Sequence, residues 1–255
     1  MYRLANSVPM IFDDPVRWWL GPLSGASGHH LDDWIVWHAR VMVAAWAILL
    51  PLGVMAARYF KVTPQQDWPR QVDNRAWWQA HRWFQYGGFA LMAVGVVLSW
   101  NRGVQASAAA QWHGYLGWSI VALGGLQIVS AWARGSKGGP TEATMRGDHY
   151  DMTPHRLRFE AVHKMGGWLA VVLAVVTVGL GLIAADAPRW MVLVLAVWWL
   201  LMGFATLRLE RAGRCIDTYQ AIWGPDPAHP GNQRQRVGWG MRRPLSNPSA
   251  DTTIR

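Results

Sequence analysis

Five apolar runs dominate the sequence, and each is long enough to cross a membrane as a helix. They cover Trp34–Phe60, Trp77–Trp100, Ala108–Trp132, Phe159–Ala185 and Arg189–Leu207. A spanning helix needs about 20 apolar residues to cross a hydrocarbon core of roughly 30 Å. Because lipid offers no partner for backbone polar groups, such runs must satisfy their own hydrogen bonds as helices. The sequence therefore predicts an all-α integral membrane protein with five transmembrane helices.

Composition agrees with this interpretation. Hydrophobic residues make up 52% of the chain and charged residues only 15%, so a soluble globular protein is not expected. Many of the 19 tryptophans lie at the ends of the apolar runs, as in an interfacial aromatic belt. The predicted membrane domain covers residues 34–207. Residues 1–33 form a tail on one side, and the proline-rich residues 208–255 form a basic, largely irregular tail on the other.

Basic residues are concentrated on one side of the predicted membrane domain. Of the 24 lysines and arginines, 19 lie at or between the helix ends that share the side of the C-terminus. The positive-inside rule places that side in the cytoplasm, so the predicted protein crosses the plasma or inner membrane with its N-terminus outside. Arginines beside a membrane usually set topology, and nucleic-acid binding is therefore not expected.

The first four predicted helices carry one histidine each, near the N-terminal end of each run. These are His38, His81, His113 and His163. Because consecutive helices run in opposite directions, His38 and His113 lie near the outer face, and His81 and His163 near the inner face. Metal-binding residues inside a membrane are costly and usually functional. The pattern predicts two pairs of metal ligands in a four-helix core, with the fifth helix as an addition.

Two haems of the b type are the cofactors that best fit two histidine pairs. The only cysteine is Cys215, so neither covalent haem attachment nor a four-cysteine iron–sulfur cluster is expected. The two irons would lie about 20 Å apart across the membrane. Iron held by two histidines has no open position, which favours electron transfer over binding of oxygen or substrate.

Residues around the histidines support the same interpretation. Glycines and alanines follow each histidine on its own face, where they make room either for a flat haem or for close packing between helices. On the inner side Arg82, Arg156 and Lys164 flank the ligands and are candidate partners for haem propionates. Gln127 lies 14 positions after His113 and reaches the depth of the inner pair. There it would hydrogen-bond a ligand or haem edge, or hold two helices together.

The histidine segments resemble those of the cytochrome b561 family. They read WIVWHARVMVAAW, WWQAHRWFQYGGF, QWHGYLGW with GLQIVSAWARG, and RLRFEAVHKMGGW. The resemblance covers about residues 34–182 and implies a four-helix core with two b haems, pairing His38 with His113 and His81 with His163. It also implies transfer of electrons from a cytoplasmic donor such as ascorbate to an external acceptor such as ferric iron. Arg156 fits the family's ascorbate arginine, but Trp77–Ala80 replace the lysines expected before His81.

Electron transfer through two bis-histidine haems is thus the expected function, either as a carrier or as a ferric or ascorbate-type reductase. A membrane-anchor cytochrome subunit that docks a dehydrogenase or reductase is the alternative. A haem-free transporter is disfavoured, because no helix is broken at mid-membrane. The expected partners are the bilayer, a small-molecule or quinol donor and a redox protein, and a homodimer is left open. No residue is assigned a catalytic role.

Overall fold

The computed structural model describes residues 15–27, 29–102, 107–139 and 142–244. Over these residues the secondary structure is helical, with two isolated β-bridges and no longer strand. The helices are, in chain order, α1 (Pro15–Leu20), α2 (Asp33–Met42), the π-helix η1 (Val43–Leu49), α3 (Leu50–Tyr59), α4 (Ala76–Ser99), α5 (Ala108–Trp132), α6 (Asp148–Asp151), α7 (Pro154–Ala184), α8 (Arg189–Arg211), α9 (Thr218–Trp223) and the 3-10 helix η2 (Pro230–Gln233).

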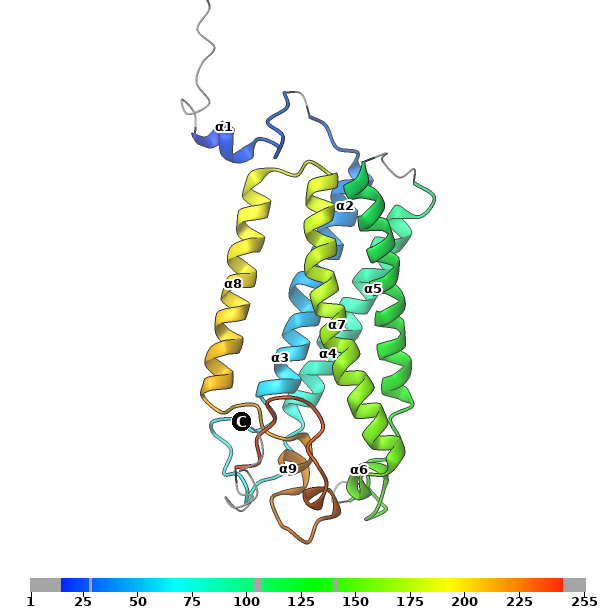
Figure 1. Ribbon diagram of the computed structural model, residues 1–255, viewed down its shortest axis with the longest axis vertical. Helices are drawn as coiled ribbons and strands as arrows, with labels where there is room; N and C mark the ends of the chain where they lie inside the picture. Colours follow the sequence, from blue (N-terminus) through cyan, green and yellow to red (C-terminus); the bar gives the residue numbers. More distant parts are fainter. Residues whose placement is uncertain (1–14, 28, 103–106, 140–141, 245–255) are drawn as a thin grey trace, which may run out of the picture.

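Five long helical rods run alongside one another, which confirms the predicted fold class (Figure 1). Among the described residues, four of them are long and apolar enough to cross a membrane: residues 33–59, α5, α7 and α8. The fifth, α4, has 24 residues but is more polar, because Gln79, His81, Arg82 and Gln85 lie in its first half. The protein is therefore a multi-pass membrane protein.

The start of α7 follows directly from a local sequence signal. Thr153 precedes Pro154, and a proline at the first helical position needs no backbone donor. In the structure Thr153 Oγ1 accepts a hydrogen bond from the Arg156 amide at 3.3 Å, and α7 begins at Pro154. The helix therefore starts five residues before the predicted apolar run, which began at Phe159.

The first long rod contains a π-helical segment at mid-length. Pro51 has no amide to donate to the Ala47 carbonyl, which is the bond that an α-helix would make there. The indole Nε1 of Trp198 on α8 donates to this carbonyl at 2.7 Å. A π turn holds more residues than an α turn. In a regular α-helix, residues 14 positions apart lie on the same face. The extra residue of the π-helical segment lets His38 and Gly53, which are 15 positions apart, both face α4.

The apolar core of the bundle lies between α2–η1, α4, α5 and α7. Its buried members are Ala45, Trp46, Met92, Ile120, Ala170 and Ala174. The closest associations pair α5 with α7 and pair α4 with the first rod. The fifth long helix, α8, stands outside this four-helix core (Figure 1). The arrangement matches the expected core of four helices with one addition.

Residues 212–244 pack against the ends of the long helices rather than extending away from them. Only α9 and η2 are helical in this segment, and the rest is irregular, as the sequence suggested. All six residues of α9 are nevertheless buried. Cys215 and Met241 pack with Tyr59 in one small core, and Asp217 pairs with Arg243 at 2.5 Å. Residues 212–244 therefore form a folded segment, called the cap below, at the end of the bundle where α3 and α8 finish.

Candidate functional site

The histidines of the first and third core helices meet near one end of the bundle. The ring centres of His38 and His113 lie 6.0 Å apart, with an interplanar angle of 79°. Each ring is held by a neighbouring helix. His38 Nδ1 lies 2.8 Å from the Gly95 carbonyl oxygen on α4, and His113 Nδ1 lies 2.9 Å from the Thr177 carbonyl oxygen on α7.

The other two histidines form a second pair of the same kind. The ring centres of His81 and His163 lie 6.4 Å apart at 78°, so the two pairs are built almost alike. His81 Nδ1 lies 2.9 Å from the Gly53 carbonyl oxygen on α3. His163 Nδ1 lies 3.3 Å from the hydroxyl oxygen of Ser130 on α5. The structure therefore brings together the two pairs that helix direction predicted.

These contacts fix the protonation of the four rings. A carbonyl oxygen only accepts hydrogen bonds, so an Nδ1 facing one must carry the proton. Ser130 Oγ donates its own proton to the Gln127 carbonyl at 2.9 Å, which leaves it as the acceptor for His163. In each neutral ring Nε2 then keeps its lone pair. A histidine that donates from Nδ1 to a carbonyl and ligates through Nε2 is the usual arrangement at metal sites.

The spacing within each pair fits one metal ion between two imidazoles. A ligating imidazole nitrogen lies about 2 Å from its metal and about 1 Å from its own ring centre, so opposed rings would be centred about 6 Å apart. Among the described residues no group of three or more His, Cys, Asp or Glu side chains is placed to hold a bare metal ion. Two imidazoles per site suit a metal whose other ligands come from a macrocycle.

The two pairs lie at well-separated depths. Gly95, which contacts His38, is 14 positions after His81 on α4, and Thr177, which contacts His113, is 14 positions after His163 on α7. At 1.5 Å per residue this spacing corresponds to about 21 Å along the helices. Each of these two helices therefore supplies a histidine to one pair and a carbonyl acceptor to the other.

Small residues near the histidines serve two different purposes. A Cβ at Gly88 or Gly95 would collide with Leu50 or Met42, so these two glycines allow close packing between α4 and the first rod. Gly181 lets α7 approach the His113 ring, because a Cβ there would lie 2.9 Å from Cε1. In contrast, Gly117, one turn after His113, has no neighbouring atom within 4 Å of the Cβ position. The position where a side chain would lie is therefore open space.

Gln127 occupies the depth predicted for it, at the contact between α5 and α7. A Cβ on Gly166 would collide with the Gln127 amide nitrogen, so the side chain lies against the α7 backbone. The residue that contacts His163 is Ser130, one turn further along α5. The sequence analysis did not single out Ser130, since one serine among the apolar residues of a helix carries no distinctive pattern.

Aromatic rings and cations surround the His81/His163 pair. Trp78 stacks on His81 with ring centres 6.1 Å apart, and the guanidinium of Arg134 lies 4.6 Å from the centre of the Trp78 ring. In the same way Phe159 lies 5.2 Å from His163, with the Arg156 guanidinium 5.0 Å from its ring centre. Burial lowers the pKa of Arg134, and the positive charges of Arg156 and Arg82 lower it further. This crowding of cations is a favourable setting for an anion.

Glu160 is the acidic centre of this region and was missed by the sequence analysis. Its carboxylate accepts from Arg156 Nε at 2.9 Å and from Lys164 Nζ at 2.7 Å. Lys164 also donates to the carbonyl of Val237 in the cap. Arg156 and Lys164 thus lie where predicted but are engaged with Glu160. Arg82 lies at the exposed surface, beside the ring of Tyr86.

His149 lies in the short helix α6. It is buried against Tyr219 and Trp223, and its Nε2 lies 3.7 Å from a Glu160 oxygen. Burial, reinforced by nearby Arg156, lowers the pKa of His149 to about 3, so the ring is neutral. Its burial depends on α9, a contact between distant segments that has no local sequence signature.

Comparisons with known proteins identify two relatives. A cytochrome b561, DM13 and DOMON domain-containing protein of Arabidopsis thaliana is 27% identical over 168 residues, which cover 66% of this chain and 16% of that protein. A putative ferric-chelate reductase 1 homolog of Drosophila melanogaster is 28% identical over 225 residues, which cover 84% and 31%. This chain spans less than a third of either relative. No family model and no solved structure matches it. The two relatives confirm the resemblance to the cytochrome b561 family.

Proposed function

We propose that this chain transfers electrons across the membrane through two b-type haems, one held by His38 and His113 and the other by His81 and His163. The observation that carries the proposal is the geometry of the two pairs. Each has ring centres about 6 Å apart and Nδ1 atoms engaged by carbonyl or hydroxyl oxygens, which leaves Nε2 available as a ligand.

A haem supplies an iron that cycles between two oxidation states, and the protein residues set its position and environment. The carbonyls of Gly53, Gly95 and Thr177 and the hydroxyl of Ser130 orient the four rings. An iron held by both histidines of a pair would have no vacant position for oxygen or substrate, so such a site would favour outer-sphere electron transfer. The single cysteine, Cys215, is buried in the cap, so both haems would be bound without covalent attachment.

The inner pair is the proposed entry point for electrons. The positive-inside rule assigns the cap and its end of the bundle to the cytoplasm and the N-terminus to the opposite side. Arg82, Arg134 and Arg156 form a cationic region next to the inner pair, and they are the proposed partners of the haem propionates or of an anionic donor. A quinol or a partner redox protein remains an alternative donor, because tryptophans replace the lysines of the family's ascorbate site.

The Drosophila relative is named as a ferric-chelate reductase homolog. We therefore propose ferric iron, outside the membrane, as one candidate acceptor. The alternative is that the chain is a cytochrome subunit that anchors a partner dehydrogenase, and the folded cap would then be its docking surface. Purification from mild detergent distinguishes the two proposals, since the anchor subunit would elute together with its partner.

The haem proposal is tested by replacing each histidine with alanine and measuring haem content and spectra. The purified protein should contain two haems per chain, both low-spin. His38→Ala and His113→Ala should remove one spectral component, and His81→Ala and His163→Ala the other. His30→Ala, at an exposed position outside the bundle, is the matched control and should change neither. One haem per chain, or loss of the same component in His38→Ala and His81→Ala, would contradict the pairing.

A further inference from the structure

The short helix α1 lies at the outer end of the bundle, fastened to the link between α7 and α8. Leu23 donates its amide to the Ala187 carbonyl, and Arg189 donates its amide to the Gly21 carbonyl, both at 3.1 Å. Ser24 Oγ donates to the Asp186 carboxylate at 2.6 Å. These bonds, with a β-bridge between Pro22 and Pro188, fix the segment after α1 in register with the link.

Arg189 joins α1 itself to the first turn of α8. Its guanidinium donates to the Trp18 carbonyl at 2.9 Å and lies 5.1 Å from the centre of the Trp18 ring. Figure 1 shows α1 beside the outer end of α8 and roughly crosswise to the long helices. The position of α1 therefore follows the α7–α8 link.

This attachment sets the depth of α1 relative to the membrane. The spanning helix α7 ends at Ala184 and the spanning helix α8 begins at Arg189, so the link between them lies where the chain leaves and re-enters the bilayer. A helix fastened to that link lies at the boundary between headgroups and acyl chains. The arginine at the start of α8 is a suitable partner for lipid phosphates at this depth.

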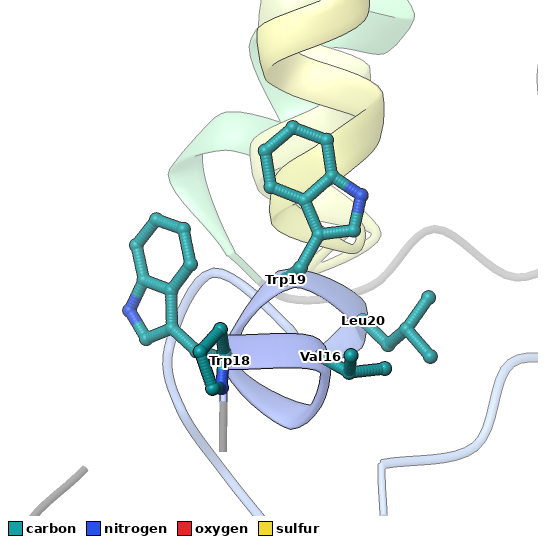
Figure 2. Close-up of a pocket in the computed structure, with 5 residues that line it drawn as sticks. Val16, Trp18, Trp19 and Leu20 are labelled. Atoms are coloured by element: carbon teal, nitrogen blue, oxygen red, sulfur yellow. The ribbon is translucent and has the colours of Figure 1, made fainter. Parts of the chain in front are cut away.

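The composition of α1 suits that boundary. Val16, Trp19 and Leu20 share one helical face, because they are spaced by three and four positions. Their exposed fractions are 63%, 40% and 59%, and none of the six residues of α1 is buried by protein. Figure 2 shows the Trp19 ring extending alongside the neighbouring pale yellow helix, with Trp18 on one side of α1 and Val16 and Leu20 on the other. Pro15, Val16, Trp18, Trp19 and Leu20 line a shallow apolar hollow.

We propose that α1 is an interfacial anchor that binds the outer leaflet of the membrane through Val16, Trp19 and Leu20. Tryptophan prefers the headgroup region, and short apolar helices lie in its plane with their apolar face in the acyl chains. An isolated helix of six residues is unstable in water. The contacts to the α7–α8 link and the lipid together hold this one in place. The anchor in turn keeps residues 21–27 folded over the outer ends of α7 and α8.

Site-directed spin labelling in lipid vesicles tests this anchor directly. Cysteines are introduced singly as Val16→Cys and Leu20→Cys, with Ser27→Cys as the control on the same segment beyond α1. The natural cysteine is fully buried and contributes little label. Collision of each label is measured with oxygen, which concentrates in the bilayer, and with a water-soluble nickel complex. Monodisperse elution of each variant verifies that it is folded.

Labels at positions 16 and 20 should collide at least several-fold more with oxygen than with the nickel complex, and the label at position 27 should show the reverse. Frequent nickel collisions at 16 and 20 would show that α1 is in water and would overturn the proposal. Protection from both agents would also overturn it, because protein, such as a second copy of the chain, would then cover this face. None of these outcomes depends on the haem proposal.

Discussion

The hydrogen bond from Trp198 to the Ala47 carbonyl should hold α8 against the core, and its strength should depend on Pro51. The bond is 2.7 Å long, half-buried and formed where Pro51 leaves the carbonyl without its usual helical donor. Interhelical hydrogen bonds in membranes contribute about 0.6 kcal/mol on average and about 1.7 kcal/mol at most. An acceptor left unpaired in an apolar setting costs about 1–3 kcal/mol. We therefore expect Trp198→Phe to lower the free energy of unfolding by about 1.5 kcal/mol.

Pro51→Ala tests whether the missing amide of Pro51 is the reason why Trp198→Phe is costly. Alanine restores an amide that can donate to Ala47, so Trp198→Phe should cost less than about 0.5 kcal/mol in this background. The four proteins of the cycle are unfolded with increasing SDS in mixed micelles and followed by circular dichroism. Trp199→Phe removes the same atoms from the neighbouring position, where the structure shows no indole hydrogen bond, and should be nearly neutral in both backgrounds. An equal cost of Trp198→Phe with and without Pro51 would refute the reasoning.

Three further outcomes follow from individual contacts. Ser130→Ala removes the acceptor for His163 Nδ1. In a redox titration it should therefore shift the midpoint potential of the haem at the His81/His163 pair and leave the other haem unchanged. An equal shift of both haems would contradict the placement of Ser130 beside that pair alone. Burial lowers the pKa of Lys61 to about 8, so the unfolded chain binds more protons between pH 8 and about 10.5. Stability should rise by up to about 3 kcal/mol across that window and less so in Lys61→Met, as measured by unfolding at several pH values. Burial raises the pKa of Cys215, so a maleimide should modify it only after unfolding; rapid labelling of the native protein would show that the cap is open.

Much of the fold could be predicted because lipid restricts the choices. The five apolar runs correspond to the five long rods. The pairing of the histidines followed from helix direction alone. His38 and His113 end up 6.0 Å apart because the first and third core helices run in the same direction, which places their N-terminal ends on the same side.

Other parts of the site depend on contacts that the local sequence does not specify. Three of the four Nδ1 acceptors are backbone carbonyls, which every residue possesses. Ser130 contacts His163 only because α5 and α7 pack together. Glu160 differs, since its partners Arg156 and Lys164 lie one turn away on the same helix. The burial of His149 requires α9, some 70 positions away in the chain. The spacing of residues along the sequence does not reveal such contacts between distant segments.

The carbonyl acceptors have a consequence for how the two histidine pairs tolerate mutation. Point substitutions at positions 53, 95 and 177 change side chains but cannot delete a main-chain oxygen, so His38, His81 and His113 keep their acceptors as long as the helices keep their paths. Ser130 is different, because one substitution removes the hydroxyl that faces His163. A single substitution at position 130 can therefore change the surroundings of the His81/His163 pair, while the acceptors of the His38/His113 pair change only when the helices change their paths.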